Sequence, residues 1–158
     1  MNIRNAGLLA GALVLALATS KAGVAADAHQ HAAGEHGELL LDHGHKWPTD
    51  APLRQGMAAI RAALAARHDA IHQGSLAAAD FQALASELET QVAGIVANCR
   101  LEPAADANLH LVIARLLAGA AAMQGRSGTA PAAGAVQAIE AVNDYGRYFD
   151  HPGWQPLG

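Results

Sequence analysis

Apolar residues recur at intervals of three and four along four stretches of the chain, a spacing that lines one face of an α-helix. Ala, Leu, Gln, Glu and Arg dominate these stretches, and few β-branched residues alternate with polar ones as they would in a strand. The pattern predicts helices over residues 49–74, 75–102, 103–124 and 131–148. The chain is therefore expected to be all-α.

The predicted helix boundaries are marked by residues that cap or stop helices. Thr49 or Asp50 can cap the first helix, and Ser75 can cap the second. Pro103 ends the second helix and precedes the third, and the fourth helix starts near Pro131. The loop GRSGTAP, with its two glycines, separates the third helix from the fourth.

Each predicted helix has an apolar face that should form part of the core. The expected core residues are Leu53, Met57, Ile60, Leu64, Ile71, Phe81, Leu84, Leu88, Val92, Ile95, Cys99, Leu109, Val112, Ile113, Leu116, Ala120, Met123, Val136, Ile139 and Val142. Cys99 is expected at the centre of the buried face of the second helix. Abundant alanine and only 4% aromatic residues predict closely spaced helices around a thin core.

Four helices joined by short loops pack most simply as an antiparallel up-down-up-down four-helix bundle. The predicted fold is this bundle, preceded by an extended histidine-rich N-terminal segment. In such a bundle the starts of the first and third helices share one end with the ends of the second and fourth. Residues that are far apart in the sequence would meet there.

The first residues are typical of a secretory signal peptide. Arg4 precedes an apolar run over residues 6–19, and Val24-Ala25-Ala26 has the pattern of a cleavage site. The expected organisation is a signal peptide at 1–26, a flexible histidine-rich segment at 27–46 and the bundle at 47–158. The mature protein is predicted to be periplasmic or secreted and free of the membrane, with an uncleaved N-terminal anchor as the alternative.

The net charge and the number of cysteines limit which partners the chain can bind and whether it can form a disulfide. The formal net charge is −4, and cleavage would remove Arg4 and Lys21, which leaves the mature chain more acidic. Nucleic acid and anionic membrane surfaces are therefore not expected partners. Cys99 is the single cysteine, so no internal disulfide can form.

Histidines are concentrated before the first helix. Residues 29–45, HQHAAGEHGELLLDHGH, contain five of the nine histidines of the chain. A histidine-rich tract is a compositional cue for metal binding, and neutral imidazole is the commonest metal ligand. The part HQHAAGEH is expected to be flexible with generic metal affinity, whereas LLLDHGHKWP can dock on the bundle through Leu39–Leu41 and Trp47.

The expected topology gathers candidate metal ligands at one end of the bundle. His43 and His45 precede the first helix, and His151 follows the fourth. The flanks DHGHKWP and DHPGWQP would be anchored by Trp47 and Trp154, which would hold these three histidines near one another. The further candidates at this end are His110, Cys99 and Met57. Imidazole, thiolate and thioether ligands suit copper first, and zinc or nickel next.

Each of these candidates also has a structural interpretation. Cys99 and Met57 can be core residues, and His110 can lie at the boundary of its helix face. His68 and His72, four residues apart on the first helix, form a second candidate pair at the opposite end of the bundle, or else a solvated helix edge.

The segments APLRQGMAAI and AVNDYGRYF resemble helices 1 and 4 of the cytochrome b562 family of periplasmic four-helix bundles. The resemblance implies that Met57 occupies the position of that family's axial methionine and Gly146 the position of its axial histidine. Haem b would therefore need a replacement ligand, such as His110 or His151. Covalent c-type haem is excluded because the single cysteine cannot form a C-x-x-C-H motif.

The chain has no G-x-S-x-G, H-E-x-x-H, P-loop or dinucleotide-binding motif, and an enzyme is not expected. The leading prediction is an exported helical-bundle protein that binds a transition metal, copper first, in metal handling or resistance. One alternative is a b-type haem electron carrier. The other is a cofactor-free bundle that binds a protein partner, for which an exposed patch of Tyr148, Phe149 and Trp154 would be the structural support.

Overall fold

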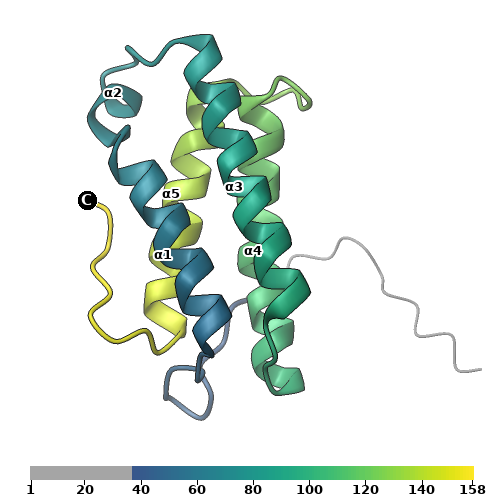
Figure 1. Ribbon diagram of the computed structural model, residues 1–158. Helices are drawn as coiled ribbons and strands as arrows, with labels where there is room; N and C mark the ends of the chain where they lie inside the picture. The colour runs from purple at the N-terminus through teal and green to yellow at the C-terminus, as the bar shows by residue number, and fades with distance from the viewer. Residues whose placement is uncertain (1–36) are drawn as a thin grey trace, which may run out of the picture. The chain divides into compact units, whose positions relative to one another are not determined.

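The computed structural model describes residues 37–158, so the predicted signal peptide and the histidines at 29, 31 and 36 lie outside the described part. The elements are α1 (Ala51–Ala65), α2 (His68–His72), α3 (Ala78–Asn98), α4 (Pro103–Met123) and α5 (Pro131–Tyr148) (Figure 1). Within residues 37–158 the only β pairing consists of two isolated bridges. The prediction of an all-α chain is confirmed for this part. None of its helices is long and apolar enough to cross a membrane.

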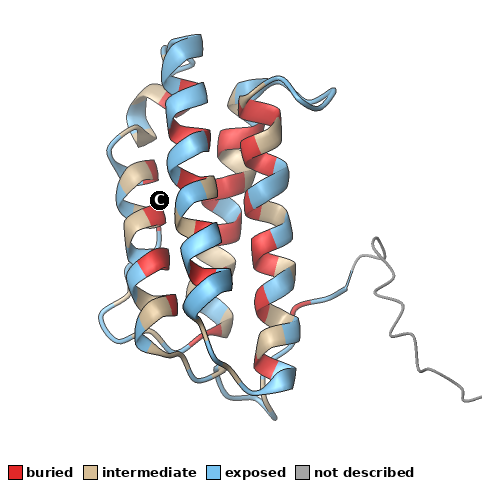
Figure 2. Cartoon of the chain, turned by 45° about the vertical axis from the view of Figure 1, so that its right-hand side comes forward, coloured by how far each residue is buried: buried red, intermediate tan, exposed pale blue. Residues whose placement is uncertain are grey.

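The predicted apolar faces form the core. Every predicted core residue is buried except Val136 and Cys99, which are half-buried. Contacts join α1 to α3 and α5, and α4 to α3 and α5, and Figure 2 shows the buried residues on the sides of the helices that face one another. The helices are closely spaced where alanine and glycine meet, because a Cβ atom at Gly119 in α4 would lie 2.6 Å from the carbonyl oxygen of Gly134 in α5.

The first predicted helix is not continuous, and this part of the prediction is wrong. It breaks after α1 at Arg67, whose φ of −117° and ψ of 2° leave the helical range, and resumes as the short α2. No glycine or proline marks the break. Two contacts hold Arg67 there: its Nη2 atom lies 2.7 Å from Oε1 of Glu87 in α3, and its Nη1 atom donates to the carbonyl oxygen of Ala63 at 3.1 Å. The bend places Ile71 in the core, at 3% exposure.

The predicted boundaries of the second helix also need correction. Ser75 does not cap it, because α3 begins at Ala78 and its N-cap residue, Ala77, makes no side-chain hydrogen bond. Cys99 is not part of the helix, since its φ of −65° and ψ of 141° are extended. The backbone leaves the helix at Cys99, and the next residue, Arg100, donates its N–H to the carboxylate of Asp50 at 2.6 Å.

Asp50 ties the start of α1 to the loop between α3 and α4. Its Oδ1 atom accepts the N–H of Leu53 at 2.9 Å, which confirms the predicted N-cap, and its Oδ2 atom accepts the N–H of Arg100. One carboxylate thereby satisfies a backbone donor at the start of α1 and another in the loop after α3.

The segment before α1 docks less completely than expected. Of the three leucines predicted to dock, only Leu39 is buried, at 5% exposure, whereas Leu40 and Leu41 are 58% and 43% exposed. Leu40 is held by its backbone instead: its N–H donates to Oδ1 of Asn108 at 2.9 Å, and its carbonyl oxygen accepts from Nε1 of Trp47 at 2.6 Å.

The C-terminal tail, residues 150–158, turns back after α5 and runs beside α1 (Figure 1). Nε of Arg61 in α1 donates to the carbonyl oxygen of Gln155. The side chain of Asn143 in α5 binds both backbone groups of Leu157, at 2.9 Å and 2.8 Å. Leu157 is buried at 8% exposure, so the tail is packed against the core.

Candidate functional site

The two flanks of the helices, before α1 and after α5, pair with each other. The N–H of Trp47 donates to the carbonyl oxygen of Tyr148 at 2.8 Å, and the N–H of Asp150 donates to that of Trp47 at 2.8 Å. The hydroxyl of Thr49 also donates to the carbonyl oxygen of Asp150, at 2.6 Å. The similar flanks seen in the sequence therefore lie side by side.

This pairing does not gather His43, His45 and His151 into one set of ligands. Asp42 and His45 exchange two backbone hydrogen bonds of 2.8 Å around a tight turn. His43 has a φ of +48° at the tip of this turn, and its side chain is 98% exposed. Within residues 37–158, no three His, Cys, Asp or Glu side chains are placed to hold one metal ion.

His151 is instead part of an aromatic cluster at the end of α5. Its Nδ1 atom is 3.0 Å from the hydroxyl of Tyr145, and its ring lies 4.7 Å from that of Trp154. Burial, and then the positive charge of Arg54, lower the pKa of His151, while Asp150 acts in the opposite direction. Burial raises the pKa of Tyr145, so its hydroxyl stays protonated at neutral pH.

Cys99 lies against the carboxylate of Asp50 rather than beside another metal-ligating side chain. Burial, and then the negative charge of Asp50 and its hydrogen bond to the thiol, raise the pKa of Cys99 to about 11. Burial alone would raise the pKa of Asp50, but hydrogen bonds from the N–H groups of Arg100 and Leu53 outweigh it and lower that pKa. Asp50 is therefore a carboxylate at neutral pH, and Cys99 is a neutral thiol.

This environment predicts slow alkylation of Cys99 by iodoacetamide at pH 8, because the thiolate is the reacting species. The Asp50→Asn variant lacks the negative charge that disfavours the thiolate of Cys99, while asparagine can still cap α1. We expect alkylation to become about 3–10-fold faster, since one pKa unit corresponds to a tenfold change in thiolate. Intact mass measured against time gives the rate. An unchanged rate in Asp50→Asn, with the fold intact by circular dichroism, would contradict the assigned role of Asp50.

The surroundings of Met57 and Gly146 do not fit a haem. Met57 is completely buried in the core, at 0% exposure. The indole of Trp154 covers Gly146 so closely that a Cβ atom at this glycine would lie 2.3 Å from Cδ1 and Nε1 of the indole. A haem between Met57 and position 146 would have to displace Trp154 and open the core.

His110 does not supply a replacement haem ligand beside Met57. Its side chain is 61% exposed on α4, and its Nδ1 atom lies 2.9 Å from the carbonyl oxygen of Asp106 on the same helix. His110 is therefore a solvent-exposed residue, further from the buried face of α4 than the boundary position predicted for it.

His68 and His72 are the candidate ligands that the structure does bring together. Their ring centroids are 4.4 Å apart, with the rings inclined by 54°. Nε2 of His68 is 2.5 Å from the carbonyl oxygen of Gly158 in the C-terminal tail. Because this backbone oxygen only accepts hydrogen bonds, Nε2 is the donor, and in the neutral imidazole the lone pair is then on Nδ1. That Nδ1 atom lies 3.5 Å from Oδ1 of Asp69.

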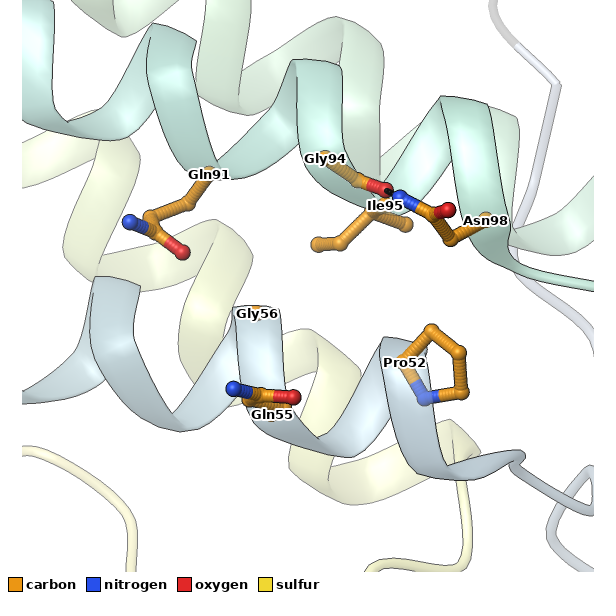
Figure 3. A pocket seen from close by; sticks show the side chains of 7 residues that line it. All are labelled: Pro52, Gln55, Gly56, Gln91, Gly94, Ile95 and Asn98. Carbon is orange, nitrogen blue, oxygen red and sulfur yellow. Dashed lines mark hydrogen bonds between the residues drawn. The ribbon is translucent and has the colours of Figure 1, made fainter.

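A groove follows the seam between α1 and α3. Its first hollow, of about 350 Å³, is lined by Pro52, Gln55, Gly56, Gln91, Gly94, Ile95 and Asn98 (Figure 3). A second hollow, of about 570 Å³, continues from Gln91 along Ala59, Ala62 and Ala63. Ile95 reaches across to Gly56, where a Cβ atom would meet it at 2.4 Å. The side chains that line the first hollow include no titratable group, so it offers amide hydrogen bonds and apolar contact.

The aromatic patch that would have supported a protein-binding function is not exposed. Phe149 is 0% exposed, and Tyr148 and Trp154 are half-buried and packed against the core. The large apolar side chains that are exposed in residues 37–158 are Leu40, Leu41, Val96 and Leu117.

Three residues that organise this region were not singled out from the sequence. Tyr145 could have been found, because it continues the helical spacing of Ile139 and Val142 on the buried face of α5. Arg61 and Asn143 carry no such signal, since their role is to hold a tail that has no periodic pattern.

No protein-family model matches the chain, and no curated protein or solved structure is significantly similar to it.

Proposed function

We propose that the chain is an exported, non-enzymatic four-helix bundle that binds a transition metal, copper first and zinc or nickel next, in metal handling. In this proposal the four long helices run antiparallel in an up-down-up-down order. Short loops and the contacts of α1 and α4 with both α3 and α5 support that topology. The signal-peptide pattern of residues 1–26 supports export to the periplasm or beyond.

The pair formed by His68 and His72 is the observation that carries the metal proposal. Two imidazoles one helical turn apart can bind one ion together, and their ring centroids are 4.4 Å apart. Metal-binding histidines commonly donate their other N–H to a carbonyl or carboxylate, which fixes the tautomer and the ring orientation. The carbonyl oxygen of Gly158 occupies this position on His68.

Asp69 lies beside the free lone pair of His68, although His68, His72 and Asp69 are not placed as a set of three ligands in this conformation. Two ligands that each lie about 2.0–2.2 Å from one metal ion are roughly 3–3.5 Å apart. Nδ1 of His68 and Oδ1 of Asp69 are separated by 3.5 Å, and the carboxylate is 93% exposed and free to turn.

Copper is placed first because imidazole ligands suit it and because Cu²⁺ binds most strongly among the divalent first-row ions. Two protein imidazoles leave coordination positions for water, so the site is suited to exchange of the ion rather than to permanent storage. The histidines at 29, 31 and 36, which lie outside the described residues, are proposed as further ligands of generic affinity.

Isothermal titration of the chain with Cu²⁺ and Zn²⁺ tests the proposal. We expect a Cu²⁺ dissociation constant below about 0.1 mM. His68→Ala and His72→Ala should each weaken this binding by at least about tenfold, because each removes one of two protein ligands. To separate the pair from the N-terminal histidines, both variants are also measured in a chain in which residues 29, 31 and 36 are alanine.

His110→Ala is the matched control, because it removes one exposed histidine from another helix. Its Cu²⁺ affinity should equal that of the parent chain. Binding weaker than about 0.1 mM, or affinities unchanged in both His68→Ala and His72→Ala, would overturn the proposal.

A further inference from the structure

A small pocket lies between α1 and the C-terminal tail, away from the pair of histidines that carries the metal proposal. It has a volume of about 190 Å³ and is lined by Ala58, Arg61, His151, Gly153, Trp154 and Gln155. Pockets that bury drug-sized ligands measure roughly 300–1,000 Å³, so this one suits a smaller molecule.

Arg61 provides a positive charge in this pocket that no carboxylate neutralises within residues 37–158. The arginines at positions 67, 115, 126 and 147 each form an ion pair with an aspartate or glutamate, whereas Arg61, like Arg54 and Arg100, forms none among the described residues. Arg61 is a half-buried residue, and its Nε atom donates to the carbonyl oxygen of Gln155. Its two terminal NH₂ groups remain available as donors, in the fork geometry that matches a carboxylate.

The neighbouring groups favour an anion with an apolar part. Nδ1 of His151 is engaged with the hydroxyl of Tyr145 at 3.0 Å, so Nε2 remains as the second polar atom of the ring. Burial, and then the positive charge of Arg54, lower the pKa of His151, while Asp150 acts in the opposite direction, so the imidazole adds no fixed charge beside Arg61 at neutral pH. The indole of Trp154, 4.7 Å from the imidazole between ring centroids, supplies an apolar wall.

We propose that this pocket binds a small organic carboxylate, with the carboxylate on the guanidinium of Arg61 and the apolar part against Trp154. The planar, bidentate fit between guanidinium and carboxylate fixes the orientation. An inorganic anion such as phosphate would make no use of the indole wall. This inference is independent of metal binding and requires no metal ion.

Benzoate is the probe for the experiment, and the fluorescence of Trp154 is the signal. The chain has two tryptophans, so Trp47→Phe leaves Trp154 as the only one. In this background we expect benzoate to cause a saturable change of the emission of Trp154. The dissociation constant should be about 0.1–5 mM, because a small ligand makes few contacts. Arg61→Gln should weaken benzoate binding by about tenfold or more, because the bidentate partner is lost.

Ala58→Leu keeps Arg61 and His151 and places a larger side chain at the lining of the pocket. It should also abolish the saturable change, which separates loss of the pocket from loosening of the tail in Arg61→Gln. Phosphate should bind more weakly than benzoate. No saturation by benzoate up to about 20 mM, an unchanged affinity in Arg61→Gln, or tighter binding of phosphate would each overturn the proposal.

Discussion

Gly146→Ala is expected to destabilise the protein by about 1–3 kcal/mol, although the same change in an ordinary helix is stabilising. The reason is the indole of Trp154, because a Cβ atom at Gly146 would lie 2.3 Å from its Cδ1 and Nε1 atoms. The indole must move away, which weakens its contacts with Tyr145 and His151. Urea unfolding, followed by circular dichroism and by the emission of Trp154 in a Trp47→Phe background, measures both effects.

Gly94→Ala is the matched control for this prediction. Gly94 is an exposed position within α3, and a Cβ atom there meets no other atom within 4 Å. Alanine should therefore stabilise the protein by about 0.5–1 kcal/mol, the usual gain over glycine in a helix. Equal and stabilising effects at both positions would show that Trp154 does not rest on Gly146.

The same contact bears on the resemblance to cytochrome b562. Gly146→His would restore the axial histidine that the resemblance implies. Because Trp154 covers the position and Met57 is completely buried, we expect this variant to lose stability and to leave the Soret band of added haemin at the position of free haemin. A b-type absorption spectrum would contradict the steric argument directly.

Tyr145→Ala is expected to cost about 3–5 kcal/mol of the free energy of unfolding, the usual range for loss of a large aromatic side chain from a core. Tyr145 is 0% exposed and touches the elements that close the end of α5. Its ring stacks on Phe149 at 5.3 Å and meets the edge of Trp154 at 4.8 Å, and its hydroxyl is 3.0 Å from Nδ1 of His151. Chemical denaturation at constant pH gives the difference in the free energy of unfolding between Tyr145→Ala and the parent chain.

Tyr145→Phe separates the packing of the ring from the hydrogen bond of its hydroxyl. This variant keeps the aromatic contacts and loses only the partner of His151, so we expect a cost of about 1 kcal/mol. A similar loss in Tyr145→Phe and Tyr145→Ala would assign the stability to the hydrogen bond instead of the core. No loss in either variant would mean that the tail does not depend on Tyr145.

The sequence alone determined the helical faces and several boundaries of this protein. Residues such as Leu53, Met57 and Ile60 recur at helical spacing, and burying them together is favourable whatever their neighbours are. Asp50 could be recognised as a cap for the same reason, because its bond to the N–H of Leu53 is local. Periodicity and capping act over a few residues, so they can be read directly from the order of amino acids.

Tertiary structure alone decided where the helices break and which candidate ligands meet. α1 ends where Arg67 reaches Glu87, and Cys99 leaves α3 where Asp50 accepts the N–H of Arg100, 50 positions away. Likewise His151 turns toward Tyr145 instead of joining His43 and His45. These outcomes depend on single polar contacts between segments far apart in the chain. Such contacts leave no periodic pattern in the sequence. The sequence could therefore indicate the candidate ligands, but not which side chains each of them would contact.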